Sequence, residues 1–228
     1  MNVEIWSDIA CPWCAVGKRR FEKALAGFEH REDVTVTWRA FELDPEAPDE
    51  RSGSRDEHLA EKYGTSVEQA REMHDRMTET AAGEGLDFRF DIARSANTFD
   101  AHRMVHLAAA HGRQEAMKER LLLAHFTEGE LISDHATLKR LALEAGLPED
   151  EIDDTLATDR FADAVREDEA TARGLGISAV PFFVIDRRFG LAGAQPPEVI
   201  GEGLRRAWEA QAPLAVVAEG DVCGPDGC

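Results

Sequence analysis

The stretch Cys11-Pro12-Trp13-Cys14 constrains this chain most, because it stands between a strand pattern and a helix pattern. A short apolar run at residues 3–7 precedes it, and apolar residues at helical spacing follow it over 14–28. Pro12 suits the first position of a helix, where a missing backbone N–H costs nothing. A thiol at this junction faces unpaired N–H groups and the positive end of the helix dipole, which favour a thiolate. The placement predicts thiol–disulfide exchange, with Cys11 as the nucleophile and Cys14 as the resolving thiol.

Two other interpretations of the cysteine pair stay open at this point. The pair could be half of a metal site, or it could be two buried thiols without chemistry. A structural zinc site needs four ligands, and the chain has no second close Cys-x-x-Cys. Redox chemistry is therefore favoured, and no metal ligand is assigned.

Length, composition and charge exclude several classes of protein. The chain has 228 residues, of which 43% are hydrophobic, and no apolar stretch approaches the ~18–20 residues of a membrane span. Its N-terminus has neither a basic region nor an apolar core, so we expect no secretory signal and a cytoplasmic location. A formal charge of −19 argues against nucleic-acid binding. Attraction to basic partners is one interpretation of this charge, but a solvated acidic surface is favoured.

The order of elements predicts an α/β protein with a long helical middle. Strands at 3–7 and 34–41 flank the helix at 14–28, which predicts a parallel pair with a crossover helix. A strand pattern returns over 176–186, Arg187-Arg188 predicts a tight turn, and a hairpin partner follows at 189–193. Helices are expected near 54–63, 66–83, 97–111, 114–128, 134–145, 148–157 and 159–173, and from Pro196-Pro197 to about 211. Their expected starts are Ser66, Asn97 and Asp134, and left-handed ends are expected at Gly112, Gly129, Gly146 and Gly174.

Three segments together make the chain resemble a known family. They are 8–14 after the first strand, the helical insertion, and 176–184, and Gly193-Ala194-Gln195 and a two-cysteine tail add to them. With them the chain resembles the thioredoxin fold, specifically DsbA-like oxidoreductases of the FrnE type, whose relatives include 2-hydroxychromene-2-carboxylate isomerase. The resemblance implies β-α-β, a large inserted α-helical domain, then β-β-α. The implied domains are a thioredoxin-like domain (1–45 and 174–212), the insertion (46–173) and a C-terminal tail (213–228).

The resemblance also implies site residues beyond the two cysteines. It implies a cis Val180–Pro181 bond facing the cysteines, with Pro181 in the catalytic set and the Val180 backbone free to pair with an extended substrate. Without the resemblance, a proline at a strand start is an ordinary edge device. The candidate substrate-binding residues are Trp13, Val180, Asn97 and His102.

His102 and His106 lie four residues apart on one expected helix, which could place two imidazoles on one face. A metal or acid–base site is one interpretation. An ordinary helix face is favoured, because no third ligand is evident.

A second cysteine pair, Cys223 and Cys228, encloses Gly-Pro-Asp-Gly, a turn sequence that can bring the two sulfurs together. One hypothesis is a second redox pair that shuttles electrons between Cys11/Cys14 and an outside reductant. The alternatives are a small disulfide clip on the tail and two idle thiols.

Three functions remain under consideration. The first is a protein-disulfide oxidoreductase or isomerase that acts on protein thiols and disulfides, needs no cofactor beyond its redox-active disulfide, and takes thioredoxin or glutathione as reductant. The second is a glutathione-linked isomerase or transferase of the 2-hydroxychromene-2-carboxylate isomerase or kappa type, with glutathione as co-substrate. Those relatives typically carry a serine-type residue where Cys11 stands, which disfavours this alternative. The third is a non-enzymatic redox-sensing module.

Overall fold

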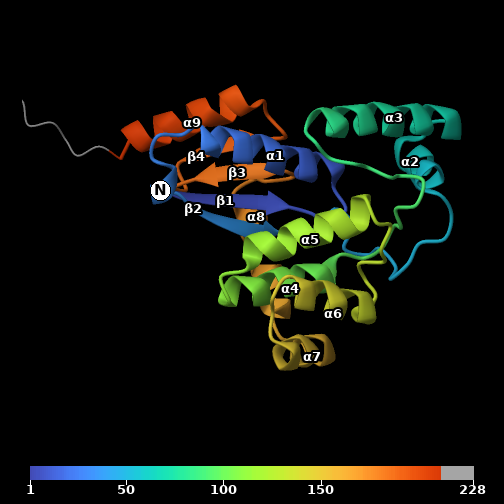
Figure 1. Ribbon diagram of the computed structural model, residues 1–228. Helices are drawn as coiled ribbons and strands as arrows, with labels where there is room; N and C mark the ends of the chain where they lie inside the picture. The colour runs from blue at the N-terminus through green and yellow to red at the C-terminus, as the bar shows by residue number, and fades with distance from the viewer. Residues whose placement is uncertain (212–228) are drawn as a thin grey trace, which may run out of the picture.

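A computed structural model describes residues 1–211 of the chain and contains one mixed sheet (Figure 1). The strand order is β2-β1-β3-β4, with β1 and β2 parallel and the other two pairs antiparallel. The crossover from β1 to β2 is α1 (Pro12–Ala26), and α9 (Pro197–Glu209) follows β4. This order confirms the predicted thioredoxin fold. The strands are β1 (Asn2–Ser7), β2 (Thr35–Ala40), β3 (Phe182–Ile185) and β4 (Phe189–Ala192).

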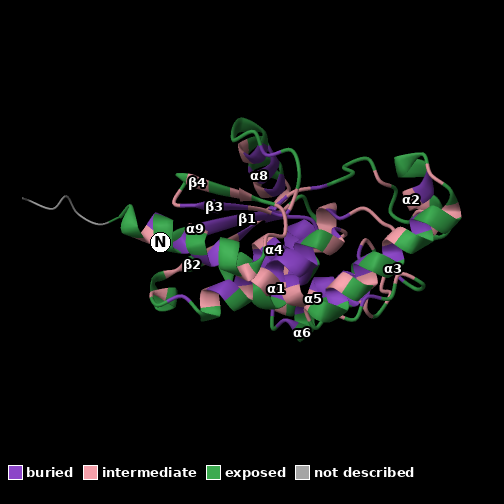
Figure 2. Cartoon of the chain, turned by 90° about the horizontal axis from the view of Figure 1, so that it is seen from above, coloured by how far each residue is buried: buried purple, intermediate pink, exposed green. Residues whose placement is uncertain are grey.

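A run of helices between β2 and β3 forms the predicted insertion. Ser66 and Asp134 cap two of these helices as expected, each accepting a hydrogen bond from a backbone N–H three residues later. Figure 1 shows α2 and α3 beyond the end of the sheet and α4 to α7 on the opposite side from α1 and α9, and Figure 2 shows α8 across the strands from α1 and α5. The helices are α2 (Arg55–Tyr63), α3 (Val67–Gly83), α4 (Phe99–Ala110), α5 (Gln114–Phe126), α6 (His135–Glu144), α7 (Glu149–Ala157) and α8 (Ala162–Gly174).

Three local expectations are wrong. The strand pattern over 176–186 gives only the four residues of β3, because Gly176 is left-handed and the proline at 181 has no N–H for the ladder. Gly174 was expected to be the left-handed residue, but it ends α8 and the positive φ of 73° falls on Gly176. The hairpin turn has positive φ at Asp186 and Arg187, so the turn begins one residue earlier than Arg187-Arg188.

The hydrophobic core runs without a break from the sheet into the insertion. Val3 and Ile5 of β1 share one cluster of buried side chains with Met104 of α4 and Leu121 of α5. Figure 2 shows the same continuity, with buried residues extending from the strands into α4 and α5. Trp6 points to the other face, where its indole N–H donates to the Asp168 carbonyl of α8 at 2.9 Å. The domain boundaries at 45/46 and 173/174 stay a prediction, since no separate core marks them.

One side chain fixes the insertion to the edge of the sheet. The amide of Gln114, at the start of α5, accepts a hydrogen bond from the Trp38 N–H and donates one to the Trp38 carbonyl, both at 2.9 Å. It thereby satisfies backbone groups that the edge strand β2 would otherwise leave unpaired. This anchor sets the position of α5, which carries a lysine toward the candidate site.

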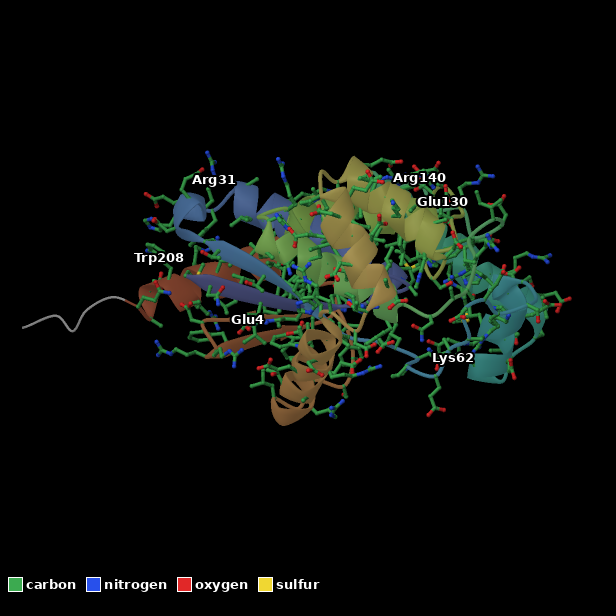
Figure 3. All side chains as sticks on the ribbon, turned by 90° about the horizontal axis from the view of Figure 1, so that it is seen from below. Glu4, Arg31, Lys62, Glu130, Arg140 and Trp208 are labelled. Atoms are coloured by element: carbon green, nitrogen blue, oxygen red, sulfur yellow. The ribbon has the colours of Figure 1, made fainter. Side chains whose placement is uncertain are left out.

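Ion pairs cover much of the acidic surface. Arg140 and Glu130 lie close together on the outer surface in Figure 3, with 2.5 Å between Nη2 and Oε1. Lys18 is buried among three carboxylates, those of Glu22, Glu115 and Glu119, so its ammonium meets their charge. No helix within residues 1–211 is long and apolar enough to cross a membrane.

Candidate active site at the start of helix α1

Cys11 and Cys14 occupy the beginning of α1 as the sequence predicts. Cys11 is the N-cap residue, with an extended backbone (φ −91°), and Pro12 is the first helical residue. The backbone carbonyl of Cys11 accepts a hydrogen bond from the Cys14 N–H at 3.0 Å, which puts both cysteines in the first turn. Both are thiols and both are buried, Cys11 at 4% exposed and Cys14 at 1%. The side chain between them, Trp13, is 47% exposed and gives the rim an apolar surface.

The loop before β3 meets the cysteines, and its Val180–Pro181 bond is cis, as the resemblance implies. Sγ of Cys11 lies 3.7 Å from the carbonyl oxygen of Val180. Gly17, one turn along α1, permits this approach, because a Cβ there would lie 2.8 Å from Cγ of Pro181. The structure therefore brings Cys11, Val180 and Pro181 together. Sequence reasoning missed Gly17, whose role depends on a contact across the fold.

A buried lysine lies beside the cysteine pair and was also missed. Lys118 of α5 is 1% exposed, and its Nζ lies 3.5 Å from the Ser7 carbonyl and 5.5 Å from the centre of the Trp38 ring. Burial lowers the pKa of Lys118, while the negative charges of the Cys14 thiolate and the Asp8 carboxylate oppose that shift. Burial, followed by the interaction with Cys11, raises the pKa of the Cys14 thiol well above its ordinary value, and the Lys118 charge lowers it.

Asp8 supplies a buried carboxylate at the same place. It accepts hydrogen bonds from the backbone N–H of Leu43 at 2.8 Å and of Ala10 at 3.3 Å. Burial raises its pKa, but His102, the Leu43 N–H and Lys118 together hold the pKa of Asp8 below its usual range. The site therefore pairs a buried anion with a buried cation next to Cys14. The feature of the sequence that could have identified Asp8 as a site residue is its position, three residues before Cys11.

The two histidines of α4 do not share a site. Nε2 of His102 lies 3.4 Å from the Asp8 carboxylate, whereas Nε2 of His106 lies 3.0 Å from the Asp168 carboxylate. Burial lowers the pKa of His102, so its imidazole is neutral at neutral pH. Two separate carboxylate partners argue against a shared metal ion and place His102, but not His106, beside the candidate site.

The side chain of Asn97 makes hydrogen bonds to the backbone around it. Its amide nitrogen donates to the carbonyls of Pro45 and Ala47, at 3.4 and 3.2 Å, and its amide oxygen accepts from the Phe99 N–H at 2.8 Å. The helix starts at Phe99 and not at 97, since Asn97 holds the turn before it. A substrate-binding role for Asn97 stays a prediction. Cys223 and Cys228 lie outside the described residues.

A second buried acid lies next to this region, at the end of β2. Glu42 is 5% exposed, and its neighbour Leu43 is the residue that donates to Asp8. Burial, followed by the neighbouring carboxyl group of Glu169, raises the pKa of Glu42 to about 7, and Arg166 opposes the shift. The folded protein therefore holds a proton on Glu42 that the unfolded chain releases near its ordinary pKa of 4.5.

This shift predicts a pH-dependent stability. Because the folded pKa is the higher one, the free energy of unfolding should fall as pH rises from about 4.5 to about 7, by up to about 3 kcal/mol. Glu42→Gln, which mimics the protonated acid, should remove this fall. Urea unfolding of both proteins between pH 5 and 8 measures it. Parallel stability curves, or the same change in the exposed control Glu61→Gln, would contradict the assignment.

These features define the class: a thioredoxin-fold protein with a dithiol at the start of its first helix, facing a cis-proline loop. The chain belongs to the family of the DSBA-like thioredoxin domain, whose model matches residues 2–205.

Solved structures agree with this membership. A probable DsbA oxidoreductase, SCO1869 from Streptomyces coelicolor, is 46% identical with a TM-score of 0.89, and the match covers 100% of this chain and 98% of that one. The cytosolic disulfide reductase DsbM from Pseudomonas aeruginosa shares the fold at 18% identity and a TM-score of 0.65, covering 92% and 100%. A 2-hydroxychromene-2-carboxylate isomerase does so at 12% identity and a TM-score of 0.68, covering 92% and 97%.

Proposed function

We propose that the protein is a thiol–disulfide oxidoreductase or disulfide isomerase that acts on protein disulfides through Cys11 and Cys14. The observation that carries this proposal is the Val180 carbonyl, 3.7 Å from Sγ of Cys11 and beside the buried Cys14. An extended substrate that pairs with the Val180 backbone would hold its disulfide against the Cys11 sulfur. The exposed Trp13 would pack against apolar side chains of the substrate.

The reaction proceeds in two exchanges. The Cys11 thiolate attacks one sulfur of a substrate disulfide, forms a mixed disulfide and releases the other sulfur as a thiolate. Cys14, once deprotonated, attacks the Cys11 sulfur, closes the Cys11–Cys14 disulfide and releases the second substrate thiol. Two electrons pass to the substrate, and thioredoxin or glutathione would then supply two electrons that reduce the Cys11–Cys14 disulfide again. Run backwards, the same steps oxidise a substrate dithiol.

Reduction of insulin disulfides with dithiothreitol tests the proposal. The wild type should accelerate insulin precipitation, and Cys11→Ser should return the rate to the uncatalysed background. Activity that is unchanged in Cys11→Ser but requires glutathione would support the second candidate, a glutathione-linked enzyme. Its support is the isomerase relative together with a DsbM structure solved with glutathione. No turnover in either assay would favour a redox-sensing module.

The tail cysteines give a separate prediction, since we propose that Cys223 and Cys228 relay electrons from the reductant. Oxidised Cys223→Ser/Cys228→Ser should be reduced by thioredoxin or glutathione more slowly than the oxidised wild type, while insulin reduction by a pre-reduced sample stays unchanged. Equal reduction rates would remove the relay and leave a clip or idle thiols. A cytoplasmic location, supported by the likeness to a cytosolic reductase, is part of the proposal and would supply both reductants.

A further inference from the structure

A cavity of about 730 Å³ lies within the helical insertion, between α2, α3 and the segment 88–95. This volume falls in the range of small-molecule sites, roughly 300–1,000 Å³. Phe88 and Phe90 form an apolar part of its wall. Phe88 also packs in one cluster with Ala15 and Val16, the two residues that follow Cys14. The cavity is therefore separate from the dithiol but joined to it through packed side chains.

Arg55 brings a half-buried side chain with a buried Nε to this cavity, without a carboxylate to match its charge. Its Nη1 lies 3.2 Å from Nε2 of His125, and its buried Nε has no hydrogen-bond partner. The guanidinium lies 5.5 Å from the centre of the Phe90 ring. Burial lowers the pKa of Arg55 to about 10, so the group is still charged at neutral pH. Within residues 1–211, no acidic oxygen lies within salt-bridge distance of Arg55 (4.0 Å), whereas Arg71, Arg89 and Arg94 of the same wall each have one.

His125 does not neutralise this charge. It is fully buried, and burial, followed by the positive charge of Arg55, lowers its pKa to about 3. The imidazole is therefore neutral at neutral pH and accepts from Arg55 through Nε2, which leaves the hydrogen on Nδ1. Nδ1 is also buried without a partner in the described part of the chain. The hydrogen-bond partner of Arg55 is therefore a neutral imidazole, which does not compensate the positive charge of the guanidinium.

We propose that this cavity binds a small molecule through an oxyanion, a carboxylate or a phosphate, with Arg55 as the charge partner. An unpaired charge that is partly removed from water, with a buried donor left unsatisfied, is costly, and a bound oxyanion would reduce that cost. The planar fork of arginine donors matches the two oxygens of a carboxylate or phosphate. Phe88, Phe90 and Ile92 would contact an apolar body attached to the anion. This site does not depend on the proposed disulfide chemistry.

Calorimetric titration of the full chain with sodium phosphate and with sodium benzoate, each at constant ionic strength in sodium chloride, tests the proposal. At least one probe should bind saturably to the wild type, and the stronger probe identifies the phosphate or the carboxylate as the preferred group. Arg55→Gln should weaken that binding at least about 10-fold. Arg71→Gln, which removes an exposed arginine of the same wall that already pairs with Asp56, should change it less than about 2-fold.

An NMR measurement keeps the test independent of the variant's folding. The Nε–H resonance of Arg55, identified by its absence in Arg55→Lys, should shift as the bound probe saturates the wild type. Absence of saturable binding by both probes, or binding that leaves this resonance unmoved, would overturn the site. So would a folded Arg55→Gln protein that binds like the wild type.

Discussion

Cys14→Ser should turn the protein into a trap that accumulates a mixed disulfide between Cys11 and its substrate. Without the resolving thiol, only an outside thiol can release the adduct, and Cys11 is just 4% exposed. We expect steady-state insulin reduction to fall on the order of 100-fold. Non-reducing electrophoresis and intact mass spectrometry should show the protein joined to one insulin chain.

The matched control is Cys11→Ser, which should form no adduct although Cys14 is present, because Cys14 is more deeply buried and its thiol has a raised pKa. Both variants belong in a Cys223→Ser/Cys228→Ser background, so that the tail thiols cannot capture substrate. An adduct in Cys11→Ser would make Cys14 the attacking thiol. The absence of an adduct in Cys14→Ser would contradict the role of Cys14 as the resolving thiol.

Local features of the site were predictable from the sequence. Pro12 at the first helical position and a strand immediately upstream specify where the dithiol lies, because both are set by residues close in the chain. The resemblance supplied the cis bond at Pro181, which no local pattern indicates. The prediction of a strand over 176–186 was wrong for a physical reason. Apolar residues such as Ile177 indicated a paired strand, but Ile177 is buried by packing in the cluster of Trp6 and does not pair with a strand.

The charges beneath the dithiol were not predictable in this way. Lys118 lies in a helix with polar neighbours, where a lysine is usually exposed, and only the packing of α5 against β2 buries it. That packing depends on Gln114 at the edge of the sheet, a contact between segments far apart in the sequence. His102 was identified as a cleft residue, but its partner Asp8 appears only once α4 is placed.

Lys118→Met should slow the second exchange more than the first, because the Lys118 charge interacts more strongly with the Cys14 thiolate than with the Cys11 thiolate. Removing the buried cation takes away the charge that lowers the pKa of Cys14, so less Cys14 is deprotonated at neutral pH. We expect the mixed disulfide to resolve about 10-fold more slowly at pH 7. The loss should shrink only as pH approaches the raised pKa of Cys14, because the Cys14 thiol then ionises without the help of Lys118. Quenched-flow measurement of mixed-disulfide decay between pH 6.5 and 9.5 gives this profile.

The stability of the same variant separates a chemical role from a structural one. Methionine has nearly the length of lysine and no charge to bury, so Lys118→Met should unfold at the same or a higher urea concentration, although Asp8 then loses its cation. Exposed Lys62→Met should change neither rate nor stability. A destabilised Lys118→Met protein with an unchanged pH profile would make the lysine part of the fold alone. A slower resolution step in an equally stable protein would show that Lys118 promotes the ionisation of Cys14 and does not stabilise the fold.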